Sequence, residues 1–282
     1  MIDLKQAIQA SDIATWVAFL RTADIPVLKQ TAREIKQLQA DEDNVSARDI
    51  TLVVINDPMM VFKVLSYAQT HKGANQLQDL VQVEQAILMM GTSTFFNKIP
   101  INLQVDDVLH HDLTALTHLL KSIRRAHRAA HYAADWASRL MDLRAEEIRL
   151  AALLYDLAEL LMWCFASEKM NTIFKMQQAD RALRSRELQK QVLGFVGKDL
   201  QKEIVQAFQL PPLLRELMAD DASNHQRVKN VRIAVNLARH SANGWDDAAL
   251  PDDYKDIAEL LRVDVERAMQ IVGAPKDGIF RT

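Results

Sequence analysis

The chain has 282 residues, with 34 lysines and arginines against 37 aspartates and glutamates, which gives a net charge of −3 at pH 7. This balance excludes a globally basic surface, so we expect no nucleic-acid partner. Seven glycines and seven prolines are few for this length and favour an all-α fold.

The cysteine content and the hydropathy pattern bear on the compartment. One cysteine, Cys164, excludes a disulfide within the chain and a zinc site built from cysteines. The first six residues show no signal pattern, and no stretch approaches the roughly 20 apolar residues of a membrane span. We therefore expect a cytoplasmic protein without a membrane partner.

The first hundred residues predict short helices with clear breaks. An amphipathic helix at 13–20 carries Trp16 and Phe19, and we expect residues 1–21 to be an extension that docks onto the body of the same chain, with a homodimer contact left open. Ser46 and Asp49 form a capping-box pattern ahead of a helix. The remaining helices expected here span 27–38, 50–55, 59–68, 83–90 and 92–96.

Longer helices are expected beyond a weak boundary at 100–107, so residues 22–108 and 109–282 are predicted to form two lobes. The polar run 177–190 is predicted to be a solvated connection. The expected helices span 112–141, 145–166, 168–178, 186–207, 211–220, 224–242, 253–260 and 264–272.

The segment 151–163 contains a carboxylate in unusual surroundings. It is apolar on nearly every side, which predicts a buried helix, and Asp156 is costly there as an ion unless another group pairs with it. The segment resembles the His-Asp helix of the HD metal-dependent phosphohydrolase superfamily, with Tyr155 where a ligand histidine would stand.

Three motifs that precede this segment carry a closer resemblance. They are the Ile25-Pro26 start, Asn56-Asp57-Pro58 followed by an apolar helix, and the run Val-Glu-Gln-Ala-Ile-Leu-Met-Met-Gly at 83–91. In this order they resemble HDOD domains, a bacterial signalling family related to HD hydrolases, over roughly residues 22–270. The resemblance implies a two-lobed all-α fold whose C-terminal lobe is similar to the HD helical bundle.

The resemblance also identifies the positions of the HD metal ligands. The first histidine matches His127, the His-Asp pair matches Tyr155 and Asp156, and the last aspartate matches Val235, or Asn236 after a shift of one residue. A phenol is a poor replacement for neutral imidazole, and neither Val nor Asn supplies a carboxylate. We therefore expect no metal, no other cofactor and no catalysis, as is common among HDOD proteins, which are regarded mainly as regulatory modules.

Two interpretations of the remaining polar residues stay open. Asp156 is expected to be held by Arg or His from the 121–135 helix, or by Tyr155 and backbone donors. Alternatively, His127, His131 and Asp135 share one stripe at i, i+4 and i+8 and form a rearranged metal site with Asp156, as in a phosphohydrolase.

A basic band lies on the same helix as His127. Its members are Lys121, Arg124, Arg125 and Arg128. Arginine recognises phosphate and carboxylate through paired donors, so this band could bind a small anion such as a nucleotide, or an acidic partner. The other interpretation is a solvated helix face that answers Glu146 and Glu147.

The leading functional hypothesis is a non-catalytic signalling protein that acts as a protein-interaction scaffold. The alternatives are the phosphohydrolase with a rearranged site and the small-anion or nucleotide sensor. A protein partner is expected, and the sequence does not identify it.

Overall fold

The computed structural model describes residues 3–71, 81–180, 183–219 and 225–275, and these residues form helices and no strand. A single isolated parallel bridge joins Val27 and Gln104. The prediction of an all-α fold is confirmed. The low glycine and proline content explains this result, because few residues interrupt the helices.

The chain divides into two compact units that are discontinuous in sequence. One comprises Met1–Ile123 and Asp156–Pro212, and the other Arg124–Tyr155 and Leu213–Thr282. The division differs from the expected boundary between residues 108 and 109. The chain leaves the first unit inside the long helix α9 (Leu113–Arg139) and returns to it at Asp156, so no linker marks the change.

The N-terminal part of the first unit contains short helices with well-defined starts. Asp12 accepts a hydrogen bond from the Thr15 amide at 2.9 Å, and the predicted capping box between Ser46 and Asp49 is present. The helices are α1 (Leu4–Gln9), α2 (Ile13–Leu20), α3 (Lys29–Gln39), α4 (Ala47–Val54), α5 (Pro58–Thr70), α6 (Val83–Met90), α7 (Thr92–Lys98) and α8 (Val105–Leu109). Neither α1 nor α8 was predicted, because both are too short to show a periodic pattern.

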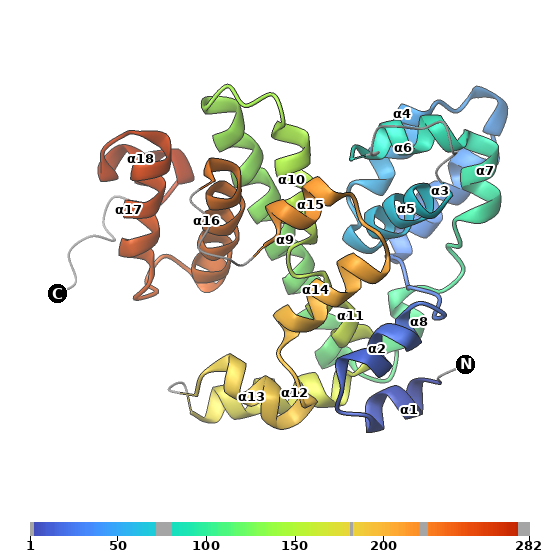
Figure 1. Ribbon diagram of the computed structural model, residues 1–282, viewed down its shortest axis with the longest axis horizontal. Helices are drawn as coiled ribbons and strands as arrows, with labels where there is room; N and C mark the ends of the chain where they lie inside the picture. The colour runs from blue at the N-terminus through green and yellow to red at the C-terminus, as the bar shows by residue number, and fades with distance from the viewer. Residues whose placement is uncertain (1–2, 72–80, 181–182, 220–224, 276–282) are drawn as a thin grey trace. The chain divides into compact units, whose positions relative to one another are not determined.

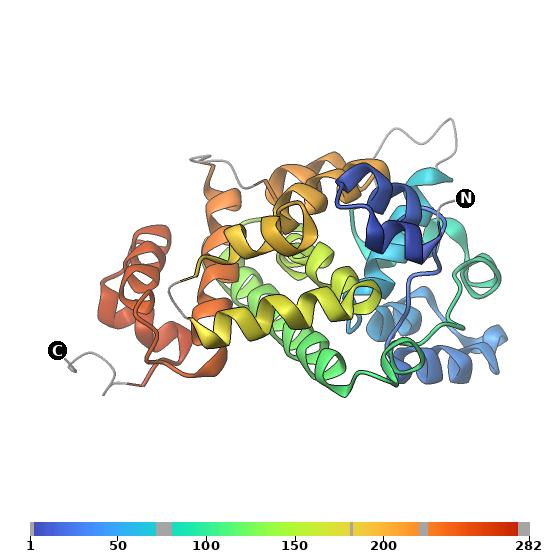
Figure 2. The same cartoon turned by 90° about the horizontal axis from the view of Figure 1, so that it is seen from below.

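Helix α2 docks onto its own unit, as expected. Trp16 is 1% exposed, and the Phe19 ring meets the Phe165 ring edge-on with 5.2 Å between centroids. Figures 1 and 2 both show α2 beside α14, and Gly194 lies so close to Ser11 that a β-carbon at Gly194 would be 2.3 Å from the Ser11 carbonyl oxygen.

The remaining helices of the first unit correct two predictions. They are α11 (Leu157–Phe165), α12 (Ser167–Ala179), α13 (Ser185–Leu193) and α14 (Gly197–Ala207). The predicted helix 186–207 is two helices, because Gly194 adopts φ +89 and closes α13. The predicted solvated connection 177–190 is mostly exposed in its described residues and joins α12 to α13, and residues 181 and 182 lie outside the described part of the chain. The predicted helix 145–166 is interrupted at residues 155 and 156, where Asp156 has φ −105 and ψ 28.

The second unit is built around α16. Figures 1 and 2 show α17 between α16 and α18, with α10 on α16 as well. Trp136 of α9 and Val231 of α16 are fully buried in this unit. Besides the later part of α9, its helices are α10 (Ala145–Leu154), α15 (Pro212–Leu217), α16 (Gln226–His240), α17 (Leu250–Leu261) and α18 (Val265–Val272), with the 3₁₀ turn η2 (Ser241–Asn243).

The length and hydropathy of the described helices show whether one of them could span a membrane. None of them alone is both long and apolar enough to cross a bilayer. One pair, Ala145–Phe165 with Ser167–Ala179, has the length and composition when taken together, but it is bent by 110°.

Candidate functional site

The four positions that match HD ligands fall on three helices and one break. His127 is half-buried on α9, Tyr155 is 7% exposed at the end of α10, and Val235 is 3% exposed on α16. All three belong to the second unit, whereas Asp156 is the first residue of the returning segment of the first unit.

Asp156 is half-buried, whereas Tyr155 and Leu157 beside it are buried, so the predicted burial of the segment 151–163 holds around Asp156 but not at Asp156 itself. The helix breaks at this residue, and Asp156 occupies the N-cap position of α11. Its backbone carbonyl accepts hydrogen bonds from the amides of Glu159 at 3.0 Å and Leu160 at 3.3 Å. Asp156 therefore begins a helix instead of lying within one, which brings it closer to solvent.

The donor atoms at these positions do not fit a divalent metal. Tyr155 offers a buried phenol, and Val235 offers only hydrocarbon, where an imidazole and a carboxylate are required. Asn236 is half-buried and supplies an amide oxygen at best. Over residues 3–71, 81–180, 183–219 and 225–275, no three His, Cys, Asp or Glu side chains form a group that could hold a metal ion.

The alternative metal site on α9 does not come together as predicted, because His131 faces solvent and Asp135 pairs with Arg139. His131 is exposed, and the carboxylate of Asp135 accepts a hydrogen bond from Arg139 Nε at 2.7 Å. This i, i+4 ion pair occupies Asp135 with a cation of its own helix. A metal at His127 and His131 would have to compete with Arg139 for that carboxylate.

The four members of the basic band have different surroundings. Lys121 and Arg124 are exposed, whereas Arg125 and Arg128 are half-buried. Lys121 belongs to the first unit and the three arginines to the second. Lys121 and Arg124 are thus the two most solvent-exposed members of the basic band.

Arg128 anchors η2 to α9. Its guanidinium donates to the Ser241 carbonyl at 3.0 Å, to Ser241 Oγ at 2.9 Å and to the Tyr132 hydroxyl at 3.2 Å. It also lies 6.0 Å from the centroid of the Trp245 ring. Ser241 is 3% exposed, so Arg128 satisfies oxygen atoms that water does not reach. The guanidinium of Arg128 therefore donates its hydrogen bonds within the second unit.

The glutamates that were expected to answer the basic band pair with other arginines. Glu146 accepts two hydrogen bonds from Arg149, at 2.8 and 2.6 Å, and Glu147 lies 3.4 Å from Arg144. All these partners lie in or next to the first turns of α10. The expected pairing between the two helices was therefore wrong, because the shorter separations along α10 are available to both carboxylates.

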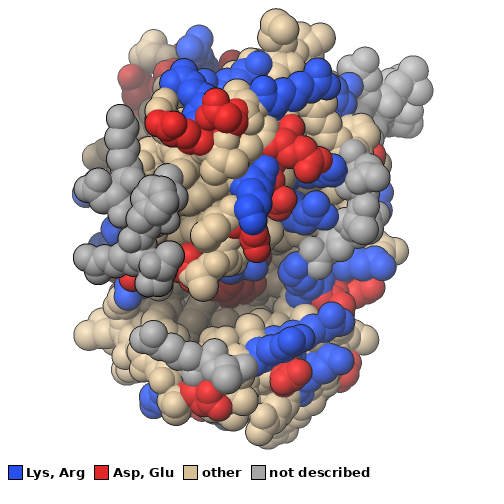
Figure 3. Space-filling model, turned by 90° about the vertical axis from the view of Figure 1, so that its left-hand side faces the viewer, with Lys and Arg blue, Asp and Glu red and all other residues tan. Residues whose placement is uncertain are grey.

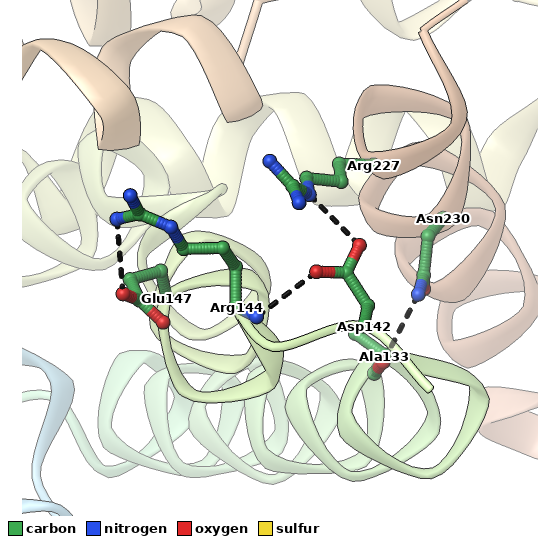
Figure 4. Close-up of polar contacts among 6 residues, drawn as sticks. All are labelled: Ala133, Asp142, Arg144, Glu147, Arg227 and Asn230. Atoms are coloured by element: carbon green, nitrogen blue, oxygen red, sulfur yellow. Dashed lines mark hydrogen bonds and ion pairs between the residues drawn. The ribbon is translucent and has the colours of Figure 1, made fainter. Parts of the chain in front are cut away.

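A polar cluster between the α9–α10 turn and α16 was not predicted (Figure 4). Asp142 accepts hydrogen bonds from Arg227 Nε at 2.8 Å and from the Arg144 amide at 2.9 Å. Asn230 donates to the Ala133 carbonyl at 3.1 Å. Partial burial raises the pKa of Asp142. The hydrogen bonds from Arg227 and from the Arg144 amide, together with the nearby positive charge, outweigh this effect and lower the pKa overall. Asp142 and Arg227 are 85 positions apart, so no local sequence signal indicates this pair.

Charges of both signs meet along α16 and α17. A cleft of 180 Å³ is lined by Lys229, Arg232 and Arg262 together with Asp256 and Glu259, and Lys229 lies 3.3 Å from Glu259. Figure 3 likewise shows Lys and Arg beside Asp and Glu on the face that it presents. Such mixing weakens the attraction for any one class of ion.

Comparisons with known proteins identify a family and a fold. The HDOD domain model matches residues 25–224. The structure is similar to that of the MmoQ response regulator from Methylococcus capsulatus strain Bath, with 15% identity, a TM-score of 0.64, and coverage of 89% of this chain and 98% of that one. It is also similar to a virulence factor (cj0248) from Campylobacter jejuni, with 13% identity, a TM-score of 0.66, and coverage of 95% and 98%. The comparison with curated proteins gave no match.

Proposed function

Since the chain belongs to the HDOD family, we propose that it is a non-catalytic bacterial signal-transduction protein that acts through contact with another protein. The scaffold presents helical surfaces, and an upstream signal changes which surface a partner meets. The proposal concerns two separate properties, the absence of metal-dependent hydrolysis and the presence of a protein partner.

The chemistry of two buried side chains carries the first property. Tyr155 and Val235 lie on different helices, and each replaces a metal-binding group by one that binds a divalent metal poorly or not at all. Both side chains are buried in the second unit, so neither position offers an open space that a metal ion with its water ligands could occupy without repacking. Loss at two helices is a stronger argument against catalysis than a single substitution.

Metal analysis and turnover assays test this property. Purified protein is loaded in turn with Mn²⁺, Fe²⁺ and Zn²⁺, and its metal content, its melting temperature and its hydrolysis of phosphomonoesters and cyclic dinucleotides are measured. We expect no stoichiometric metal and unchanged melting, because bound metal would stabilise the folded state by mass action. An active HD phosphohydrolase assayed in parallel shows that the substrates and metals are competent.

The opposite result has a clear signature. Near-stoichiometric metal, together with turnover that disappears in both Asp156→Ala and His127→Ala, would refute the proposal and favour the phosphohydrolase. Turnover that survives both substitutions would come from a contaminating enzyme, and the proposal would stand. The protein-contact property is tested separately, on a defined surface of the second unit.

A further inference from the structure

The turn between α9 and α10 exposes two large apolar side chains. Leu143 is 98% exposed and Met141 is 87% exposed, more than any other large hydrophobic residue that the structure describes. Both lie in the second unit, on either side of Asp142. A solvated leucine and methionine contribute nothing to the core, so their position calls for another explanation.

Hydrogen bonds hold this turn in one conformation. The Asp142 amide donates to the Ala137 carbonyl at 2.9 Å and the Met141 amide to the Ser138 carbonyl at 3.0 Å, which is the Schellman pattern of a helix C-terminus. The Asp142 side chain accepts from the Arg144 amide and from Arg227 of α16 (Figure 4). The two apolar side chains therefore project from a backbone that is fixed before any partner arrives.

Met141 pays a conformational penalty at its position. Its φ is +52, the left-handed region in which glycine or asparagine usually follows a helix. The other non-glycine residues with positive φ among those described are Gln209 and Arg262, and both are polar. The cap needs only the backbone of this residue, and glycine would provide it without strain, so the exposed methionine side chain is not required by the fold.

The charges around the turn are unequally exposed. In the Arg227–Asp142 pair the arginine side chain is 33% exposed and the aspartate 15%. In the Arg144–Glu147 pair the values are 49% and 7%. In both pairs the carboxylate is the more buried partner, so the guanidinium groups of Arg144 and Arg227 are the accessible charges of these pairs. Glu146, in the first turn of α10, is 41% exposed and is the one accessible carboxylate among the ion pairs described at this end of α10.

We propose that this turn is a docking site for a protein whose apolar pocket is bordered by carboxylates. Leu143 and Met141 fill the pocket, and Arg144 and Arg227 face the carboxylates. The fixed backbone reduces the entropy lost on binding, which is the advantage of a preorganised anchor. The inference rests on the proposed interaction function and assigns it a surface and a class of partner.

Photo-crosslinking in the native cell tests the site directly. The full chain carries p-benzoylphenylalanine in place of Leu143, and a matched control carries it in place of Leu52, which is 56% exposed on α4 of the first unit. We expect another protein to crosslink at position 143 at least tenfold more strongly than at position 52. Mass spectrometry of the crosslinked peptide should show an apolar segment flanked by Asp or Glu.

Binding variants then separate docking from folding. Using the crosslinked partner purified as a recombinant protein, we expect Met141→Gly and Leu143→Ser each to weaken binding at least tenfold, and Arg144→Glu to do the same by reversing a charge. Met141→Gly relieves the positive φ, so its melting temperature should be equal to or above that of the wild type. A role confined to folding would not combine weaker binding with undiminished stability.

Several outcomes would overturn the inference. They are crosslinks at position 143 to a second copy of this chain, crosslinks to lipid alone, or wild-type affinity in Met141→Gly and Leu143→Ser. Crosslinks to a protein at position 52 and not at 143 would overturn the docking site while the proposed interaction function stands. Metal-dependent turnover in the hydrolysis assay would instead overturn the proposed function.

Discussion

Replacing Arg128 distinguishes a structural arginine from a ligand-binding one. Arg128→Ala removes three hydrogen bonds, two to Ser241 and one to Tyr132, together with the cation–π contact to the Trp245 ring. Ser241 is buried, so its carbonyl and hydroxyl oxygens lose their charged donor without ready access to water.

The expected change in the free energy of unfolding follows from these contacts. A hydrogen bond to a charged group contributes about 1.5–3 kcal/mol, and part of the gain is offset because the half-buried guanidinium is desolvated in the folded state. We therefore expect Arg128→Ala to lower the free energy of unfolding by about 2–4 kcal/mol, with a fall in melting temperature of roughly 5–10 °C for a chain of this size. Arg128→Lys should recover less than half of this, because an ammonium lacks the planar fork.

Thermal and urea unfolding, followed by circular dichroism, measure these effects. Arg124→Ala is the matched control, since Arg124 is an exposed arginine of the same helix, and its effect should stay within about 0.5 kcal/mol. Equal effects of the two alanine variants would refute the structural role of Arg128. Full stability in Arg128→Lys would show that charge alone suffices and that the donor geometry has no importance.

Two further predictions concern the first unit. Gly194→Ala places a β-carbon 2.3 Å from the Ser11 carbonyl oxygen at φ +89, so we expect the free energy of unfolding in urea to fall by about 2–4 kcal/mol. Gly273→Ala is the control, because Gly273 also has positive φ but open space around it, and its free energy of unfolding should fall by about 1 kcal/mol. Equal losses in the two variants would contradict the close approach of Gly194 to Ser11. Asp57 is buried and accepts from the amides of Leu28, Met59 and Met60, and Asp57→Ala should cost about 2–4 kcal/mol. Burial raises the pKa of Asp57, so its contribution to stability is complete below the ordinary aspartate pKa and declines as pH rises through the folded-state value. The Asp57→Ala penalty should therefore be larger near pH 4 than at pH 7, and a penalty that grows with pH would contradict the direction of the shift.

Local patterns in the sequence were sufficient for several features of the fold. The capping box at Ser46, the proline start after Asp57 and the glycine end at Gly91 depend on residues within one helical turn, and the structure has helices beginning or ending at each. The docking of Trp16 was also predicted, because a large aromatic side chain on an amphipathic helix favours burial. One failure occurred at Tyr155 and Asp156, where a helix is interrupted without a strong breaker. Another occurred at Gly194, which ends α13 and was not recognised as a helix end.

The candidate site shows a different division between sequence and tertiary structure. The residue types at positions 127, 155, 156 and 235 can be read from the sequence, and the resemblance to HD hydrolases predicts that Tyr155 and Val235 stand where an imidazole and a carboxylate would be. The half-burial of Asp156 depends on where the helix breaks. That break is decided by packing, which no short pattern in the run 151–163 encodes.

The sequence by itself determined the helical class and the family resemblance, because composition and short motifs act within a few residues. Only the tertiary structure decided that Arg128 is an anchor for Ser241, and that Arg227 fixes the turn that exposes Leu143. These contacts join residues 113 and 85 positions apart. A guanidinium can pair with many oxygen atoms, and only the packing of the helices selects which of them it reaches.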